Sequence, residues 1–171
     1  TKGFQWKWSA QDRTPNHDIT IRNNDFTNIN VAIGTHQYSQ DRPHTAVRIL
    51  NNVIDGTKDY AISMMNWNQP VIQYNTIRNV HRADGKAIAI LGRGVVGGSI
   101  KHNRLEKVDR AIQFQPHVNY GFKPLYNRFT DKEKLSFRQN EVNQATVNQV
   151  VLFSKLGVYS AETSERFNFI P

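Results

Sequence analysis

The sequence predicts an all-β fold made of stacked, similar coils, and three observations lead to this prediction. The 171 residues contain 28 Ile and Val against seven Leu, and β-branched side chains favour strands over helices. A six-residue motif built on asparagine recurs five times. A second short segment, in which large apolar residues alternate with small or polar ones, recurs between the asparagine motifs. The length suits a single domain.

The asparagine motif reads apolar residue, two residues, asparagine, one residue, apolar residue. Successive asparagines are 28, 23, 28 and 37 residues apart, which is the period of stacked supersecondary units. In such a stack, equivalent positions form columns about 4.8 Å apart, so one asparagine amide can bond to the next. Asparagine also tolerates the left-handed backbone of a tight turn. The five asparagines are Asn24, Asn52, Asn75, Asn103 and Asn140.

The second segment is predicted to be a half-buried strand, because its apolar residues recur with the period of two that a strand requires. The five copies span residues 31–35, 60–64, 87–90, 111–114 and 150–153. We align them on one large apolar residue each: Ile33, Ile62, Ile88, Ile112 and Val151.

With about 25 residues per unit, this repeat resembles the right-handed parallel β-helix of the pectin-lyase-like superfamily. That superfamily includes pectate lyases, polygalacturonases, alginate epimerases and phage tailspike depolymerases. The resemblance covers roughly residues 17 to 153 and is specific for the fold and weak for activity. It implies a solenoid of about five to six coils that works on or binds a polysaccharide outside the cell, at the cell surface or on a phage particle.

The expected organisation is a partial N-terminal coil at residues 1–16, the solenoid at 17–159 and a cap or tail at 160–171. A loop inserted at about 118–134 accounts for the 37-residue spacing. Phe4, Trp6 and Trp8 alternate as in a strand, which indicates a coil that begins upstream. We therefore expect a fragment of a longer helix, completed by upstream chain or by a second copy.

Composition excludes several classes of protein. No Cys is present, so disulfides, thiolate metal sites and cysteine nucleophiles are excluded. No apolar run reaches the roughly 20 residues of a membrane span. The net charge is +8, of which residues 78–110 carry +5, and this favours an anionic partner. Because no nucleic-acid motif is present, we expect an acidic polysaccharide and no specific nucleic acid.

Several candidate saccharide contacts follow the second strands. Aromatic rings cover the C–H face of a sugar, and a guanidinium pairs with a carboxylate. Five positions after the anchors stand Tyr38, Trp67, Arg93 and His117. Nearby are His36, His44 and Asn66, and the basic cluster adds Lys86 and Arg110 as substrate-binding residues. The alternative interpretation is that the aromatic rings cover strand ends and the histidines are solvated.

Three aspartates, Asp59, Asp84 and Asp109, stand just before the second strands. In adjacent coils their carboxylates would be roughly 5–10 Å apart, which suits the acid and base of a glycoside hydrolase or a calcium site. Calcium is the one cofactor that the sequence indicates. The alternative is that each aspartate closes a turn through its own backbone.

Two classes of function stay open. A lyase or epimerase requires a base and a cation next to a carboxylate, for which Arg93, His117 and His36 are the candidates. A hydrolase would use the aspartates instead. A non-catalytic binding module, such as a surface adhesin or a phage receptor-binding protein, would use the same groove. No motif carries a catalytic residue over from the pectate lyases or polygalacturonases.

Overall fold

A computed structural model describes residues 15–35, 42–117 and 124–145, together with the backbone of three strands at 150–153, 157–159 and 168–170. All regular structure in this part of the chain is β-strand, and the strands form three large sheets and two two-stranded ones. Every pair of neighbouring strands is parallel. The predicted all-β class with stacked parallel strands is therefore confirmed.

Successive strands of the chain enter the three large sheets in turn. The first sheet contains β1 (Thr20–Arg22), β5 (Arg48–Leu50), β9 (Val71–Gln73), β12 (Gly98–Lys101) and β16 (Leu135–Arg138). The second contains β2 (Asp25–Thr27), β6 (Val53–Asp55), β10 (Thr76–Val80), β13 (Arg104–Val108) and β17 (Glu141–Ala145). The third contains β3 (Val31–Gly34), β7 (Tyr60–Met65), β11 (Ile88–Arg93), β14 (Arg110–Phe114), β18 (Val150–Phe153) and β20 (Asn168–Ile170).

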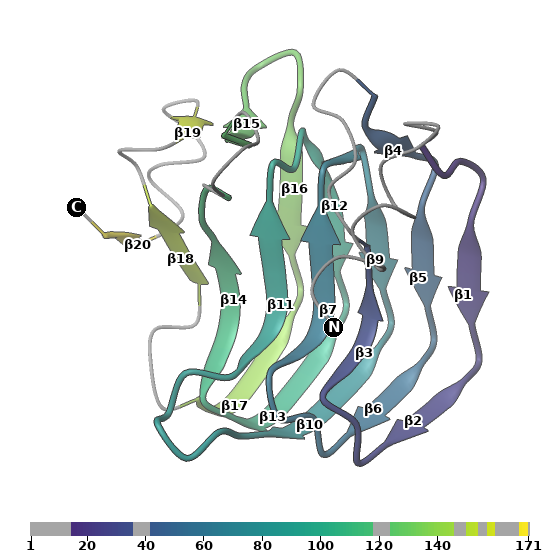
Figure 1. Ribbon diagram of the computed structural model, residues 1–171, viewed down its shortest axis with the longest axis vertical. Helices are drawn as coiled ribbons and strands as arrows, with labels where there is room; N and C mark the ends of the chain where they lie inside the picture. Colours follow the sequence, from purple (N-terminus) through teal and green to yellow (C-terminus); the bar gives the residue numbers. More distant parts are fainter. Residues whose placement is uncertain are drawn as a thin grey trace, which may run out of the picture.

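The three sheets enclose one core. In Figure 1 the strands β1 and β5 point down, β2 and β6 cross the bottom, and β3 and β11 point up. Each turn of the chain thus places one strand in each sheet, beside the strand from the turn before. The recurring strands at 31–35, 60–64, 87–90, 111–114 and 150–153 all fall in the third sheet, as predicted.

Four short strands and a few single bridges form a further line of pairing. It contains β4 (His44–Thr45), β8 (Trp67–Asn68), β15 (Asn127–Phe129) and β19 (Gly157–Tyr159). Single bridges at Val96 connect Asn68 to Arg128, so one line of pairing joins these short strands. Residues 127–129, which fall within the loop expected at about 118–134, form a strand that pairs in this line. The expected loop residues 118–123, and the N-terminal Phe4, Trp6 and Trp8, lie outside the described residues.

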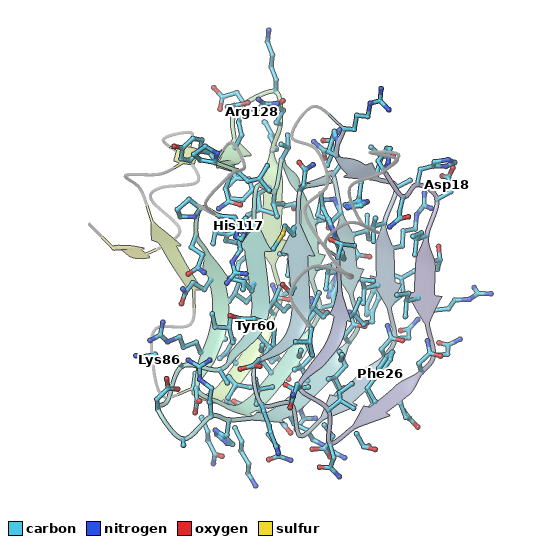
Figure 2. All side chains as sticks on the ribbon, in the orientation of Figure 1. Asp18, Phe26, Tyr60, Lys86, His117 and Arg128 are labelled. Carbon is cyan, nitrogen blue, oxygen red and sulfur yellow. The ribbon has the colours of Figure 1, made fainter. Side chains whose placement is uncertain are left out.

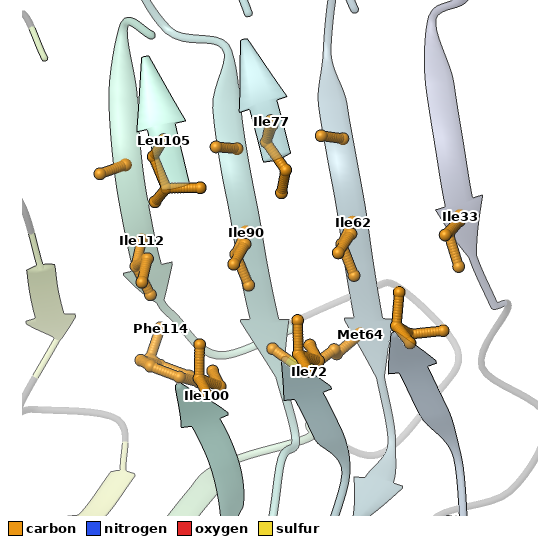
Figure 3. Packing of buried hydrophobic residues seen from close by; sticks show 14 of the residues in the cluster. Ile33, Ile62, Met64, Ile72, Ile77, Ile90, Ile100, Leu105, Ile112 and Phe114 are labelled. Atoms are coloured by element: carbon orange, nitrogen blue, oxygen red, sulfur yellow. The ribbon is translucent and has the colours of Figure 1, made fainter. Parts of the chain in front are cut away.

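Columns of aliphatic side chains fill the core. Figure 3 shows Ile62, Ile90 and Ile112 in a row on the third sheet, facing Ile77 and Leu105 of the second. All five side chains are fully buried. Because each turn adds one such residue per sheet, the Ile and Val excess of the sequence supplies most of the apolar burial that stabilises the fold.

Strand pairing corrects two of the five alignment anchors. Across the third sheet, Ile62 of β7 pairs with Ile90 of β11, Ile90 pairs with Ile112 of β14, and Ile112 pairs with Val150 of β18. The anchors Ile88 and Val151 were therefore wrong, by two residues and by one. In the segment Ala87–Ile90 both isoleucines follow the alternating pattern, so the pattern alone does not choose between them.

The predicted asparagine ladder is confirmed at the corner between the first and second sheets. Asn75 Oδ1 accepts hydrogen bonds from the backbone N–H and the Nδ2 of Asn52, both at 3.0 Å. Asn75 in turn donates its Nδ2–H to Asn103 Oδ1 at 2.9 Å and to the Ile49 carbonyl at 2.9 Å. The same pattern links the whole series Asn24, Asn52, Asn75, Asn103 and Asn140.

The left-handed backbone was predicted at the wrong residue. In the described turns, the residue before each ladder asparagine has a positive φ, and the asparagine itself does not. These preceding residues are Asn23 (58°), Asn51 (53°), Tyr74 (58°), His102 (55°) and Gln139 (57°). The ladder asparagine is used for its amide, and the turn conformation falls on its neighbour.

The ladder predicts unequal effects of truncating its members. Asn75→Ala leaves the Asn52 donors and the Ile49 carbonyl unsatisfied in a buried place, so we expect a loss of about 3–5 kcal/mol of unfolding free energy. Asn24→Ala, at the exposed end of the ladder, is expected to cost about 1 kcal/mol. Urea denaturation of both variants measures the difference. Equal losses would contradict a stabilising role that depends on burial.

Candidate functional site

A network of polar side chains runs along the outer face of the third sheet. Arg110 donates its Nη1–H to Gln113 Oε1 at 3.1 Å, and Gln113 lies 2.6 Å from one end of the Gln115 amide. The other end of that amide lies 3.0–3.1 Å from two nitrogens of Arg93 and accepts two hydrogen bonds when its oxygen stands there. In that orientation the contact with Gln113 joins two amide nitrogens and is not a hydrogen bond, so Gln115 is bonded to Arg93 and Gln113 to Arg110. We call this group the arginine strip; it comprises Tyr60, Arg93, Arg110, Gln113, Gln115 and His117.

Arg93 lies against the sheet at the end of β11. Its guanidinium carbon is 5.4 Å from the centroid of the Tyr60 ring, and its Nη2–H donates to Tyr60 Oη at 3.3 Å. A cation–π contact at a partly exposed site contributes on the order of 0.5–1 kcal/mol. Together with Gln115, this contact fixes the direction of the guanidinium while leaving Arg93 half-buried and accessible.

The strip keeps its positive charge. Within the described part of the chain, Arg93 and Arg110 pair with no carboxylate, whereas Arg78, Arg82, Arg104 and Arg128 each do. Arg110 Nε is buried and has no hydrogen-bond partner among the described residues. Neutral amides therefore satisfy part of the guanidinium hydrogen bonding without cancelling the charge, and the strip suits a bound anion.

His117 stands beside this charge, just after β14. It exchanges two backbone hydrogen bonds of 2.9 Å with Leu125. Burial lowers the pKa of the His117 ring, and the positive charge of Arg93 lowers it further. The ring is therefore neutral near pH 7 and able to accept a proton. Figure 2 shows His117 above Tyr60 on the side of the molecule that the third sheet forms.

A second cluster lies at the lower end of the same sheet, near Lys86 in Figure 2. Arg82 bonds to both oxygens of Asp84 at 2.6 and 2.9 Å and reaches Asp59 at 3.2 Å. Lys86 Nζ is 3.8 Å from Asp84. The predicted aspartate column is also wrong in register, because the pairing of Ile88 with Tyr60 puts Ala87 next to Asp59. Asp84 stands three residues earlier, in a turn.

Asp109 holds the loop at 81–87. Its carboxylate accepts hydrogen bonds from His81 Nδ1 at 2.8 Å, from the Arg82 N–H at 2.9 Å and from the Ala87 N–H at 3.2 Å. Burial raises the pKa of Asp109, but these hydrogen bonds outweigh it and hold the pKa below its ordinary value. The three predicted aspartates are thus engaged in ion pairs and turns. Among the described residues, no group of three or more His, Asp or Glu is arranged to hold a metal ion.

The remaining candidates lie apart from the strip. Trp67 is 1% exposed, belongs to the core and donates its Nε1–H to Thr35 Oγ1 at 2.6 Å. His44 is also 1% exposed, and its Nδ1 accepts from the Asn16 N–H. Asn66 is buried in a left-handed turn between β7 and β8. The rings of Trp67 and His44 are therefore too deeply buried to contact a sugar. His36 and Tyr38 lie outside the described residues.

Register explains why the predicted column fails. Arg93 pairs with Met65, two residues before Trp67, so the two predicted column members occupy different levels. Of the predicted site residues, the structure brings together Arg93, Arg110 and His117 in the strip, and Asp59, Asp84 and Lys86 around Arg82. Sequence reasoning missed Tyr60, Gln113 and Gln115 as members of the strip. Gln113 was visible as the polar residue in a position where the first coils carry Gly34 and Ser63.

Comparison with known proteins gave no match. No family model matches the chain, and no match was found among the curated proteins or the solved structures. Within the described residues, no helix has the length and apolar character needed to cross a membrane. Fold and site together define an all-β protein of parallel sheets with a positively charged, amide-lined strip on one of them.

The hydrogen bonds of Asp109 predict a pH-dependent effect of its substitution. Asp109→Asn is expected to lower the unfolding free energy at pH 7 by about 1–3 kcal/mol, because a charged acceptor of three bonds is lost. The folded pKa lies below the unfolded one, so this contribution is present above about pH 4 and disappears as pH falls through the folded pKa. Urea midpoints of wild type and variant should therefore converge in acid.

Asp84→Asn is the matched control, since Asp84 lies in the same loop but is exposed. It should change the midpoint less at pH 7. A gap between wild type and Asp109→Asn that widens on acidification would contradict the stabilising role of the Asp109 carboxylate.

Proposed function

We propose that this chain is a right-handed parallel β-helix of the pectin-lyase-like type that binds an acidic polysaccharide on the arginine strip and removes a proton next to the sugar carboxylate. The strand order supports the fold proposal, because each sheet gains one parallel strand per turn of the chain. Parallel crossover connections are right-handed in about 98% of cases. A polysaccharide substrate would place the protein outside the cell, at its surface or on a phage particle.

One observation carries the functional proposal: the guanidinium groups of Arg93 and Arg110 are each bonded to a neutral amide, and neither pairs with a carboxylate among the described residues. A guanidinium presents a planar fork of donors that matches a carboxylate. The neighbouring positive charges would also concentrate an anionic polymer at this face.

The chemistry proposed for the strip is elimination. Arg93 would pair with the uronate carboxylate and stabilise the negative charge that forms when the adjacent carbon loses its proton. Neutral His117 would accept that proton. The electrons of the broken C–H bond form a double bond, the glycosidic C–O bond breaks, and the leaving oxygen takes a proton from water. Return of the proton without bond cleavage would give an epimerase.

Binding without turnover is the second candidate, and it is favoured because the three aspartates proposed for hydrolysis are already bonded within the fold. Asp59, Asp84 and Asp109 are all engaged in ion pairs or turns, so none of them offers the free acid and base of a hydrolase. With hydrolysis set aside, elimination is the reaction proposed for the described residues, and it depends on Arg93 and His117.

Polygalacturonate, alginate and hyaluronan are the probes for this proposal, with binding and the ultraviolet absorbance of unsaturated product measured together. Arg93→Ala is expected to weaken binding at least about tenfold, the effect of losing roughly 1.4 kcal/mol. His117→Gln should leave binding nearly unchanged and lower product formation by about 100-fold or more.

Arg104→Ala is the control, because Arg104 is ion-paired with Glu106 on the second sheet. It should change neither binding nor product formation. Wild-type binding without product would leave the binding module and remove the elimination step. Failure to bind any of the three polymers, or equal binding by Arg93→Ala, would overturn the proposed site.

A further inference from the structure

Two aromatic residues occupy a column that suits asparagine. At the corner between the first and second sheets, the residue with positive φ is Asn23 or Asn51 in the first two turns. In the turns between β9 and β10 and between β12 and β13 it is Tyr74 and His102. Tyrosine is uncommon in the left-handed region, whereas asparagine and histidine are enriched there. Each described turn at this corner has the left-handed residue, so the aromatic side chains, and not the backbone, distinguish these two turns.

The two rings are stacked, with Tyr74 exposed and His102 half-buried. Their ring centroids are 4.8 Å apart, a distance equal to the spacing of adjacent strands in a sheet, and the angle between the ring planes is 4°. Tyr74 is 54% exposed, and its hydroxyl makes no hydrogen bond within the described part of the chain. The stack therefore contributes an accessible aromatic surface with a free polar group, in addition to its contact within the turn.

This surface is separate from the arginine strip. The stack lies where the chain passes from the first sheet to the second, whereas the strip lies along the third. Charges around the stack are mixed: Lys101 precedes His102, but Arg104 is ion-paired with Glu106 and stands in register with Glu141. A nucleic acid requires a continuous basic groove beside its aromatic rings, and the mixed charges here do not provide one.

We propose that Tyr74 and His102 form a second binding site, which takes an uncharged sugar ring. An aromatic ring presents an apolar face to the C–H groups of a sugar, and the Tyr74 hydroxyl provides a hydrogen bond to a sugar hydroxyl. This site does not depend on the activity proposed for the arginine strip.

The positive φ at Tyr74 and His102 allows a test by substitution with asparagine, a residue that this backbone conformation accepts. The double variant Tyr74→Asn/His102→Asn installs the residue that two other turns carry at this position. Its thermal midpoint should equal or exceed that of wild type, because asparagine relieves the left-handed strain. Its binding to immobilised cello-, xylo- and malto-oligosaccharides should fall at least about tenfold.

Gln139→Asn, in the same column but without an aromatic ring, is the control: its thermal midpoint should also equal or exceed that of wild type, and its oligosaccharide binding should be unchanged. Binding of polygalacturonate through Arg93 should be retained in the double variant, which separates failure of this site from failure of the strip. Equal binding by wild type and double variant, or no binding by wild type, would overturn the proposal. If the double variant lost binding to a single-stranded oligonucleotide but kept its binding to the oligosaccharides, the proposal would be overturned in favour of a nucleic-acid site.

Discussion

The asparagine ladder is the interaction on which the rest of the structure depends. At the corner between the first and second sheets the regular strand pairing is interrupted, and the buried amides of Asn52, Asn75 and Asn103 continue the hydrogen bonding from turn to turn. Each amide joins both the next asparagine and a backbone carbonyl of the turn before. Because an unsatisfied buried amide is costly, only one register of successive turns satisfies the whole column.

This constraint also explains which parts of the structure were predictable from the sequence. The first and second sheets lie directly beside the ladder, so the recurring asparagine fixed their strands and their buried isoleucines in advance. The third sheet lies beyond the connection from β10 to β11, which includes the loop held by Asp109. That loop changes the spacing between the asparagine and the following strand. Ile88 was consequently taken for Ile90, and Asp84 was placed in a column that contains Ala87.

Side-chain exposure was the least predictable property. The sequence predicted that Trp67 and Arg93 both lie on the surface. In the structure Trp67 is buried in the core. Arg93 lies across Tyr60, which is 33 residues earlier in the chain. Both outcomes depend on contacts between turns that are roughly 25–35 residues apart. A column drawn from one anchor does not contain that information. Arg93 and His117 stand at different levels of the third sheet, since Gly92 pairs with Phe114, so a column drawn at one level does not join them.

The contrast between two arginines gives the strongest physical reason to regard the strip as a site. Arg82 is bonded to two carboxylates, Asp59 and Asp84, so its charge is neutralised within the fold. Arg110 is bonded to the neutral amide of Gln113 and leaves a buried Nε without a partner. A glutamate in place of Gln113 would cancel the charge of this guanidinium, but it would also bury a second charge, because the position is 3% exposed. The neutral amide satisfies one guanidinium N–H without that cost and leaves the positive charge of Arg110 uncancelled among the described residues.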